Sequence, residues 1–315
     1  MKITVLDANT LGNDIDVSRL SSVGELTVYD FTEKTQVAER IKGSDVVVLN
    51  KIKLNEENLS CADNLKLICV TATGYDNIDI SYCKSRGIQV SNIVGYSTNS
   101  VAQVTVATVL ELATHIREFN RYVTSGDYTK NGIANKVTPA FCELSGKTWG
   151  IIGLGNIGKK VAAVADAFGC KVLAFKQTPD ENYNCTDLDT LCKKSDIISI
   201  HTPLTEKTRG LIGERELSMM KPSVILYNAA RGAVTNEVAV VEAVLEGKIG
   251  AFGCDVYSIE PYPAEHPMTR IASLPNVCLT PHMAWASYEA RNLCIDEVIE
   301  NIRAFKSGVA RNKVN

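Results

Sequence analysis

The sequence predicts an α/β fold in which two domains each contain a doubly wound parallel sheet. Short, continuous apolar runs alternate with helical or polar segments along almost all of the 315 residues. This alternation is typical of strands that are buried on both faces of a parallel sheet. A glycine-rich turn, GLGNIG at 153–158, lies near the middle of the chain and directly follows one of the apolar runs. The chain is long enough for two domains with large cores.

The first five apolar runs predict an α/β domain that covers residues 1–98. Helical or polar segments such as 32–41 and 79–85 connect the runs. We expect each run to form a short buried strand. The runs lie at 2–6, 25–29, 45–49, 66–70 and 88–90.

The pattern changes at Asn99. Ser100 and Gln103 form the sequence S-x-x-Q, which is typical of the capping box at the start of a helix. An almost wholly apolar helix is predicted from 101 to about 119. Because a helix that is apolar on most sides must be buried, we expect it to lie between domains or between subunits. Residues 120–146 are polar and contain glycine, so we expect them to be irregular.

The glycine turn predicts a dinucleotide site. Residues 148–152 form the apolar run before it, and apolar residues recur at helical spacing after it. The spacing G-x-G-x-x-G allows a tight turn at Gly153, close approach of a pyrophosphate at Gly155, and close packing of the helix at Gly158. The partially positive N-terminus of the helix then faces the anion. A purely structural turn is the alternative, and the flanking strand and helix favour the dinucleotide site.

The alternation of strands and helices continues after the glycine turn. We expect strands at 171–175, 197–200, 223–227, 249–254 and 277–280, with helices that include 187–194, 213–220 and 236–247. A long amphipathic helix is predicted at 287–307, and we expect it to return to the first domain. The prediction is therefore a Rossmann cofactor domain at 99–286 and a discontinuous, flavodoxin-like domain made of 1–98 and 287–315.

Composition and charge exclude several classes of protein. A hydrophobic content of 45% and a charged content of 22% are those of an ordinary globular protein. The net charge of −3 argues against a nucleic-acid groove, and no apolar run is long enough to span a membrane. The N-terminus is typical of a strand and not of a signal peptide. The ten cysteines include no C-x-x-C pair, so we expect reduced thiols, a cytoplasmic location and no metal site.

Four further segments carry candidate site residues, and each lies where a predicted strand ends, which is where open α/β sheets bind their ligands. In TATGYDNID at 71–79, exposed backbone N–H groups could hold a carboxylate. The alternative is an ordinary turn in which Asp79 caps a helix. In NAARG at 228–232, the guanidinium of Arg231 could bind a carboxylate in bidentate fashion. The alternative is a surface arginine.

The other two segments are CDVYSIEP at 254–261 and LTPHMAWA at 279–286. Glu260 precedes a proline in a loop, where a solvated glutamate is the alternative. His282 follows a proline at a strand end, and its titration near neutral pH suits proton transfer. A structural histidine is the alternative there. The four segments together are more specific than any one of them.

As a set, these segments resemble the D-isomer-specific 2-hydroxyacid dehydrogenase family. The resemblance covers almost the whole chain and is carried by TATGYDNID, GYSTNSVAQ, GLGNIG, HTPLTEKTRGLI, MKPSVILYNAARG, DVYSIEP and PHMAW. The last segment, with Trp285, is most similar to the glycerate dehydrogenase (hydroxypyruvate reductase) branch. The resemblance implies a homodimer that acts with NAD or NADP on a 2-oxo or 2-hydroxy acid, with hydroxypyruvate and D-glycerate as the leading pair.

The resemblance also implies roles for individual residues. Arg231 would bind the carboxylate and carbonyl of the substrate, His282 would act as the acid/base, and Glu260 would favour the imidazolium form of His282. Thr73 and Gly74 would belong to the substrate loop. The implied cofactor-binding residues are Gly153, Gly155, Asn156, Ile157, Gly158, Lys176, Thr202, Ala229, Ala230, Arg231, Asp255, His282 and Ala284.

The chain departs from the usual pattern of NAD selection at Lys176. A dinucleotide fold that selects NAD usually carries Asp or Glu at this point, about 20 residues past the glycines, to accept from the ribose 2′-OH. A lysine cannot accept a hydrogen bond but could pair with a 2′-phosphate. The sequence therefore predicts use of NADP alone or alongside NAD. The alternative is that Lys176 is exposed and takes no part.

Two alternatives to the leading function stay open at this point. One is a reductase of bulkier 2-oxo acids, such as phenylpyruvate or a branched-chain oxo acid, because the sequence does not size the pocket. The other is a non-catalytic, nucleotide-sensing protein similar to the transcriptional corepressors that share this fold. The presence of Arg, Glu and His together, without a basic tail, favours the enzyme.

Overall fold

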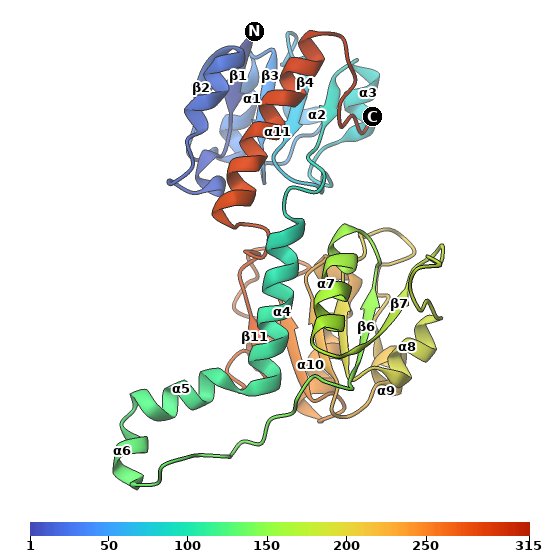
Figure 1. Ribbon diagram of the computed structural model, residues 1–315. Coiled ribbons are helices and arrows are strands. Elements are labelled where there is room, and N and C mark those ends of the chain that lie inside the picture. Colours follow the sequence, from blue (N-terminus) through green and yellow to red (C-terminus); the bar gives the residue numbers. More distant parts are fainter. The chain divides into compact units, whose positions relative to one another are not determined.

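The structure, a computed structural model, describes residues 1–315 and divides the chain into two compact units (Figure 1). Unit 1 consists of residues 1–97 and 286–315, and unit 2 consists of residues 98–285. Each unit contains a single parallel sheet with helices packed on it. The predicted fold class, two doubly wound α/β domains, is therefore confirmed.

Unit 1 contains a five-stranded sheet in the order β2-β1-β3-β4-β5, which is the flavodoxin-like order. Its central strands β3 and β4 are buried along their whole length, as their valine- and isoleucine-rich sequences predict. The strands are β1 (Lys2–Val5), β2 (Glu25–Val28), β3 (Val46–Leu49), β4 (Leu67–Val70) and β5 (Gln89–Ser91). The predicted strand at 25–29 is present as β2, but the prediction that it would be buried was wrong, because β2 is an edge strand that pairs only with β1 and is largely exposed.

The long C-terminal helix α11 (Tyr288–Lys306) packs against β4 and the short helix η2 of unit 1. Ser287 caps it by accepting a hydrogen bond from the backbone of Ala290. The chain then runs back to β5, where the backbone N–H of Val314 donates to Val90. The other helices of unit 1 are short: η1 (Ala8–Leu11), η2 (Val17–Val23), η3 (Lys34–Gln36), α1 (Val37–Ile41), α2 (Glu56–Leu59) and α3 (Ile80–Ser85).

Unit 2 contains a six-stranded parallel sheet in the order β11-β10-β9-β8-β6-β7. The strands are β6 (Thr148–Ile152), β7 (Lys171–Phe175), β8 (Ile197–Ile200), β9 (Ile225–Asn228), β10 (Ala251–Cys254) and β11 (Val277–Leu279). A single parallel bridge between Ala174 and Cys185 adds a rudimentary strand beside β7. With this bridge included, the strand order is that of a Rossmann sheet. The point at which the strand order reverses lies between the neighbouring strands β6 and β8.

Helices cover both faces of the unit 2 sheet and enclose a separate core on each. One core joins the sheet to α8 (Leu188–Lys194), α9 (Glu214–Met219) and α10 (Glu237–Leu245). The other joins it to α4 (Thr98–Thr114) and α7 (Asn156–Ala167). The remaining helices are α5 (Ile116–Thr124), α6 (Asp127–Asn131), η4 (Gly232–Val234) and η5 (Pro267–Arg270).

The predicted helix at 101–119 was wrong in its start, its end and its uniform burial. Helix α4 begins at Thr98, so Ser100 lies inside the helix, where its hydroxyl donates to the backbone oxygen of Ala284 instead of capping. The helix breaks at His115, which adopts a left-handed conformation with φ of 54°. Helix α5, which follows, buries no residue. Propensity and apolar content could not reveal this break, because neither glycine nor proline marks it.

Residues 116–146 form an arm that extends from the body of unit 2 (Figure 1). Helices α5 and α6 contact each other, and the chain returns to β6 without regular structure. The prediction that 120–146 would be irregular was therefore wrong for the part that α5 and α6 cover. Apolar side chains are exposed along the arm: Ile116, Val123, Ile133, Val137 and Phe141.

Candidate active site

The carboxyl edge of the unit 2 sheet gathers most of the predicted site residues, because all of its strands run in the same direction. The glycine turn follows β6, Lys176 follows β7, and Thr202 follows β8. Arg231, Glu260 and His282 follow β9, β10 and β11 in that order. Asn156, Ile157, Ala229, Ala230, Asp255 and Ala284 lie in the same strand-to-helix connections or at their ends.

The glycine turn is held by close backbone packing at two of its three glycines. Gly153 has a φ of 95°, and a Cβ there would lie 2.6 Å from the backbone nitrogen of Thr202. A Cβ on Gly158 would lie 2.2 Å from the backbone oxygen of Gly153. A Cβ on Gly155 would meet no atom within 4 Å, so packing within the protein does not require glycine there. An open position at Gly155, next to a helix N-terminus without a side-chain cap, fits a pyrophosphate.

The loop after β7 carries an acidic residue whose charge is already compensated. Asp180 forms an ion pair with Lys159 of α7, with 2.7 Å between the carboxylate oxygen and Nζ. The hydrogen bond from Lys159 lowers the pKa of Asp180 to about 2, with help from Asn182. Lys176, four residues earlier, is exposed to solvent. The loop thus carries a paired carboxylate at Asp180 and an exposed cation at Lys176.

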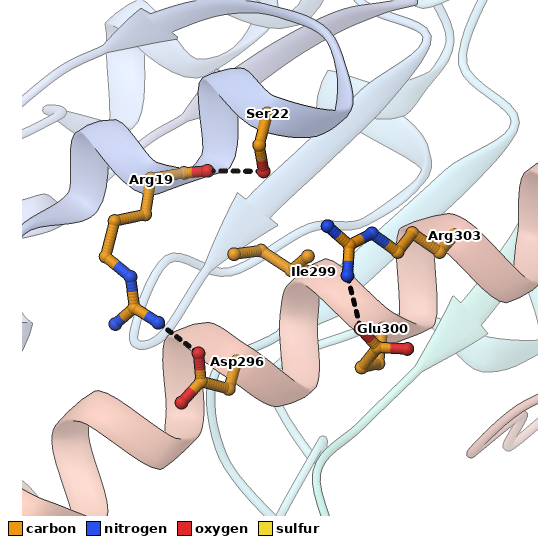
Figure 2. Close-up of a pocket in the computed structure, with 6 residues that line it drawn as sticks. All are labelled: Arg19, Ser22, Asp296, Ile299, Glu300 and Arg303. Atoms are coloured by element: carbon orange, nitrogen blue, oxygen red, sulfur yellow. Dashed lines mark hydrogen bonds and ion pairs between the residues drawn. The ribbon is translucent and has the colours of Figure 1, made fainter.

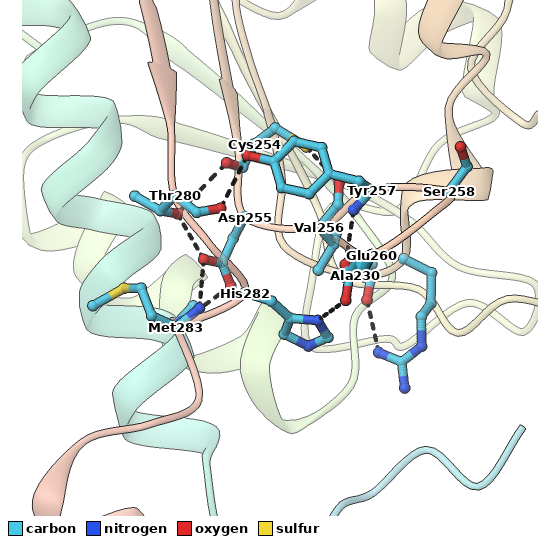
Figure 3. Close-up of polar contacts among 12 residues, drawn as sticks. Ala230, Cys254, Asp255, Val256, Tyr257, Ser258, Glu260, Thr280, His282 and Met283 are labelled. Carbon is cyan, nitrogen blue, oxygen red and sulfur yellow. Dashed lines mark hydrogen bonds and ion pairs between the residues drawn. The ribbon is translucent and has the colours of Figure 1, made fainter. Parts of the chain in front are cut away.

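His282 and Glu260 are brought into direct contact (Figure 3). The Nδ1 atom of His282 lies 2.5 Å from Oε2 of Glu260, and the backbone N–H of Tyr257 donates to Oε1 of Glu260 at 2.9 Å. Because an ionised carboxylate can only accept, Nδ1 carries the proton of the neutral imidazole. The Nε2 atom is then the one that can exchange a proton with a ligand. The arrangement is that of an acid/base oriented by a carboxylate.

The backbone of His282 is held in an uncommon conformation by Asp255. His282 has a φ of 53°, in the left-handed region that residues other than glycine rarely occupy. Asp255 is 2% exposed, and its carboxylate accepts from the hydroxyl of Thr280 and the backbone N–H groups of Met283 and Ala284. Burial raises the pKa of Asp255, and these three donors oppose that effect. The predicted contacts of Asp255 and Ala284 with a cofactor remain predictions.

Arg231 lies in a loop that is in contact with the loop that carries Glu260. A Cβ on Gly232 would lie 2.0 Å from the backbone carbon of Tyr257, so the two backbones touch at this point. The buried side chain of Asn228 fixes the Arg231 loop by donating to the backbone oxygen of Arg231 and accepting from Ala230. The guanidinium of Arg231 donates to the backbone oxygen of Ala230 at 2.9 Å. The structure therefore brings Arg231, Glu260 and His282 to one region of unit 2.

Thr73 and Gly74 follow β4 at the carboxyl edge of the unit 1 sheet. The hydroxyl of Thr73 donates to the backbone oxygen of Ile93, and its own backbone oxygen accepts from the side chain of Asn92. Asp79 caps α3 by accepting from the backbone of Tyr82, as the alternative interpretation of this segment predicted. The predicted role of Thr73 and Gly74 in substrate binding remains a prediction.

Sequence patterns did not reveal a buried carboxylate in unit 1. Asp7 follows β1 and is 3% exposed, and it accepts from the backbone N–H groups of Asn50, Lys51 and Ile52, which follow β3. These segments flank the point where the strand order of unit 1 reverses. Burial raises the pKa of Asp7. No local motif marks such a residue, because its partners lie more than 40 positions away.

The four histidines differ sharply in their surroundings. Both ring nitrogens of His201, at the end of β8, are buried without a hydrogen-bond partner, and burial lowers its pKa to about 3. His201 is therefore neutral at ordinary pH. His266 pairs with Glu237 of α10, and His115 lies at the break between α4 and α5. Among the four, His282 is the one that a carboxylate orients at a strand end.

A cavity of unit 1 lies away from the predicted site residues. It has a volume of about 520 Å³ and lies between η2 and α11 (Figure 2). Its charged side chains are paired, Arg19 with Asp296 and Arg303 with Glu300. None of the predicted site residues lines it. No group of three or more His, Cys, Asp or Glu side chains could hold a metal ion, and no helix is long and apolar enough to cross a membrane.

Comparisons with known proteins show which proteins this chain is similar to. A family model described as the NAD binding domain of D-isomer specific 2-hydroxyacid dehydrogenase matches residues 106–284. The chain is 37% identical to a hydroxypyruvate reductase of Blautia hydrogenotrophica, and the match covers 100% of both chains. It is also 37% identical to a glycerate dehydrogenase of Methylorubrum extorquens, with 99% of this chain and 98% of the relative covered.

Solved structures are similar over the full length. A D-lactate dehydrogenase of Aquifex aeolicus in complex with NAD and lactic acid has a TM-score of 0.86 and 30% identity, and 98% of this chain and 96% of that chain are covered. An acyclic imino acid reductase in complex with NADPH and D-Arg has a TM-score of 0.87 and 30% identity, with 100% of both chains covered.

Proposed function

The chain belongs to the D-isomer-specific 2-hydroxyacid dehydrogenase family, and within it we propose a reductase of small 2-oxo acids, with hydroxypyruvate and D-glycerate as its leading substrate pair. The observation that carries this proposal is the contact between His282 and Glu260. The loop of Arg231 lies against the loop of Glu260 in the same unit. The names of the two relatives that match over nearly their full length support the substrate pair.

We assign the cofactor to unit 2 and part of the substrate site to unit 1. The glycine turn and the N-terminus of α7 would hold the pyrophosphate, and the other predicted cofactor residues lie at the same sheet edge. Thr73 and Gly74 of unit 1 would present backbone N–H groups to the substrate carboxylate. Residues 99–286 would thus form the cofactor domain, and 1–98 with 287–315 the substrate domain.

The residues of the site can divide the chemistry between them. The nicotinamide, when bound, supplies or accepts the hydride. As negative charge grows on the carbonyl oxygen of the 2-oxo acid, protonated His282 donates a proton to it from Nε2. Arg231 stabilises the charge beside it, and Glu260 stabilises the imidazolium through Nδ1. In the oxidative direction, neutral His282 accepts the proton from the hydroxyl group.

A panel of 2-oxo acids tests the proposed function. We expect hydroxypyruvate to give the highest kcat/KM in NADH and NADPH oxidation assays, with glyoxylate, pyruvate, phenylpyruvate and a branched-chain oxo acid as comparisons. Preference for phenylpyruvate or the branched-chain acid would move the proposal to a bulkier substrate. Binding of NADH without turnover of any acid would contradict an enzymatic role.

Replacement of His282 tests the acid/base assignment. His282→Ala should lower kcat by about 10²–10⁴-fold, because general acid catalysis contributes a factor of this size. Binding of NADH, measured by fluorescence, should be almost unchanged, because the glycine turn holds the pyrophosphate. As a control, His115→Ala should retain full activity, because His115 lies at the base of the arm. Substantial turnover by His282→Ala would show that another group supplies the proton.

We further propose that the enzyme uses both NADH and NADPH. Lys176 stands where a carboxylate would accept from the ribose 2′-OH and repel a 2′-phosphate. Asp180, on the same loop, is paired with Lys159 and would repel a phosphate less than a free carboxylate would. An exposed ion pair contributes at most about 1 kcal/mol, which is less than a tenfold effect. Dual use therefore fits Lys176 better than strict dependence on NADPH.

Substitution of Lys176 tests the cofactor proposal. Lys176→Asp should lower kcat/KM for NADPH and leave that for NADH unchanged or higher, because a carboxylate repels the 2′-phosphate. The advantage of wild type with NADPH should also shrink as salt rises, because exposed charges are screened. Lys171→Asp is the matched control, since Lys171 is exposed at the opposite end of β7. An unchanged ratio of NADH to NADPH use in Lys176→Asp would remove Lys176 from this role.

We propose that the arm at 116–146 contributes to a homodimer. Five large apolar side chains are exposed along it, and an apolar surface of this kind is typical of a protein interface. Sedimentation at micromolar concentration should give twice the chain mass of 34.2 kDa. Replacing both Val137 and Phe141 with Asp should shift the protein toward the monomer, whereas Val238→Asp, an exposed valine on α10, should not. A wild-type monomer would contradict the proposal.

We place the protein in a reducing compartment, the cytoplasm. All ten cysteines are free, and six of them are buried. Burial raises the pKa of the Cys69 and Cys192 thiols to about 12, which disfavours the thiolate needed for disulfide exchange.

A further inference from the structure

Glu237 occupies an unusual place for the first residue of a helix. Glutamate near a helix N-terminus is ordinarily exposed and interacts with the helix dipole. Glu237, the first residue of α10, is 9% exposed, and the cap of this helix is supplied separately by Asn236. Its carboxylate therefore has a partner elsewhere, and that partner is the loop that follows β10.

Ser258 and His266 contact the carboxylate of Glu237. The backbone N–H of Ser258 donates to Oε1 at 2.8 Å, and the hydroxyl of Ser258 donates to Oε2. The Nε2 atom of His266 lies 3.2 Å from Oε2. These contacts bind the middle of the loop 257–260 to the start of α10.

His266 completes this cluster in a defined tautomer. It is 5% exposed, and its Nδ1 accepts from the backbone N–H of Met268 at 3.4 Å. The proton of neutral His266 therefore lies on Nε2, the nitrogen that is 3.2 Å from the carboxylate of Glu237. Tyr262 stacks on the His266 ring with 4.9 Å between ring centroids, and Tyr257 packs edge-on against Tyr262. These ring contacts link Tyr257 of the loop to His266 beside Glu237.

The loop that Glu237 holds is the one that presents Glu260 to His282. Tyr257, adjacent to Ser258, donates its backbone N–H to Glu260, and its hydroxyl donates to the backbone oxygen of Thr280. On the other side, the backbone at Tyr257 and Ser258 rests directly on Gly232. In Figure 3 the side chain of Ser258 points away from the pair of Glu260 and His282. A shift of Ser258 would therefore displace Glu260.

We propose that Glu237 is a positioning residue for the acid/base: through Ser258 it fixes the loop 257–260 so that Glu260 contacts Nδ1 of His282. Glu237 touches neither His282 nor a reacting atom, and it acts only through Glu260. His266 supports it by holding the second carboxylate oxygen. The functional meaning of this positioning rests on the proposed role of His282 as the proton donor.

The contact between Glu260 and His282 can be followed without any substrate, through the pH titration of the His282 imidazole. The chain has only four histidines, so their imidazole resonances can be assigned by single substitutions and titrated by NMR in the full-length protein. Glu260→Gln should move the titration midpoint of His282 to lower pH, because the imidazolium loses its anionic partner. Glu237→Ala should move it in the same direction by a smaller amount, because the partner is then held less firmly.

Two comparisons separate positioning from a long-range effect of charge. Glu237→Gln removes the same charge as Glu237→Ala but keeps an oxygen for the backbone N–H of Ser258, so it should shift the midpoint less. In a Glu260→Gln background, Glu237→Ala should cause no further shift, because coupled residues are not additive. Equal shifts for Gln and Ala, or a full further shift in the Glu260→Gln background, would overturn the proposal.

Glu242→Ala is the matched control. Glu242 lies on the same helix and pairs with Arg270 of η5, but this ion pair is exposed and does not involve the loop. It should leave the His282 midpoint unchanged, and an equal shift there would show a nonspecific effect of α10. If Glu237→Ala does not fold, the Glu237→Gln and Ser258→Ala variants carry the same test with smaller expected shifts.

Steady-state kinetics extend the test to the reaction. In Glu237→Ala the acid limb of the pH profile for oxidation should move to lower pH, with little change in the KM for the cofactor. A wild type that turns over no 2-oxo acid would contradict the proposed function and leave the NMR result standing. An unmoved His282 midpoint in Glu237→Ala would contradict the positioning role even if the wild type is active.

Discussion

The buried carboxylate of Asp255 is the interaction on which the geometry of the candidate site depends. Asp255 directly follows β10 and accepts three hydrogen bonds from the segment 280–284, including two from consecutive backbone N–H groups. These bonds hold His282 in a left-handed conformation that a residue other than glycine would not keep unaided. A carboxylate without these donors would not remain ionised in the interior. Asp255, which follows β10, therefore determines the backbone conformation of His282, which follows β11.

The remaining loops at this edge of unit 2 are coupled to one another in the same way. Gly232 lets the Arg231 loop touch the backbone of the Glu260 loop, and Tyr257 ties that loop to Thr280. Glu237 holds it from the side of α10. The proposed acid/base, its carboxylate partner and the proposed substrate arginine thus depend on contacts within a single unit. Such a site can be rigid although each of its residues lies on a loop.

The sequence predicted the strands and helices correctly where the burial that their local pattern implies is the burial that they have in the fold. The predictions were wrong where the position of an element in the fold gives it a different exposure. The strands β3, β4, β6 and β8 are continuous apolar runs and are buried on both faces. The run at 25–29 looks similar, but β2 lies at the edge of its sheet, and an edge is a property of the assembled sheet. The break at His115 was likewise not predictable from the local sequence, because neither glycine nor proline marks it.

By itself, the sequence determined the succession of strands and helices, the glycine turn and the order in which Arg231, Glu260 and His282 follow successive strands. These features depend on residues close together in the chain, and a parallel sheet then places the strand ends at one edge. Only the tertiary structure decided which side chains meet: Glu260 with His282, Asp255 with the segment 280–284, and Glu237 with Ser258 and His266. These partners are more than 20 residues apart in the sequence. A contact over such a separation forms only when the packing of the fold brings the two ends of the intervening segment together.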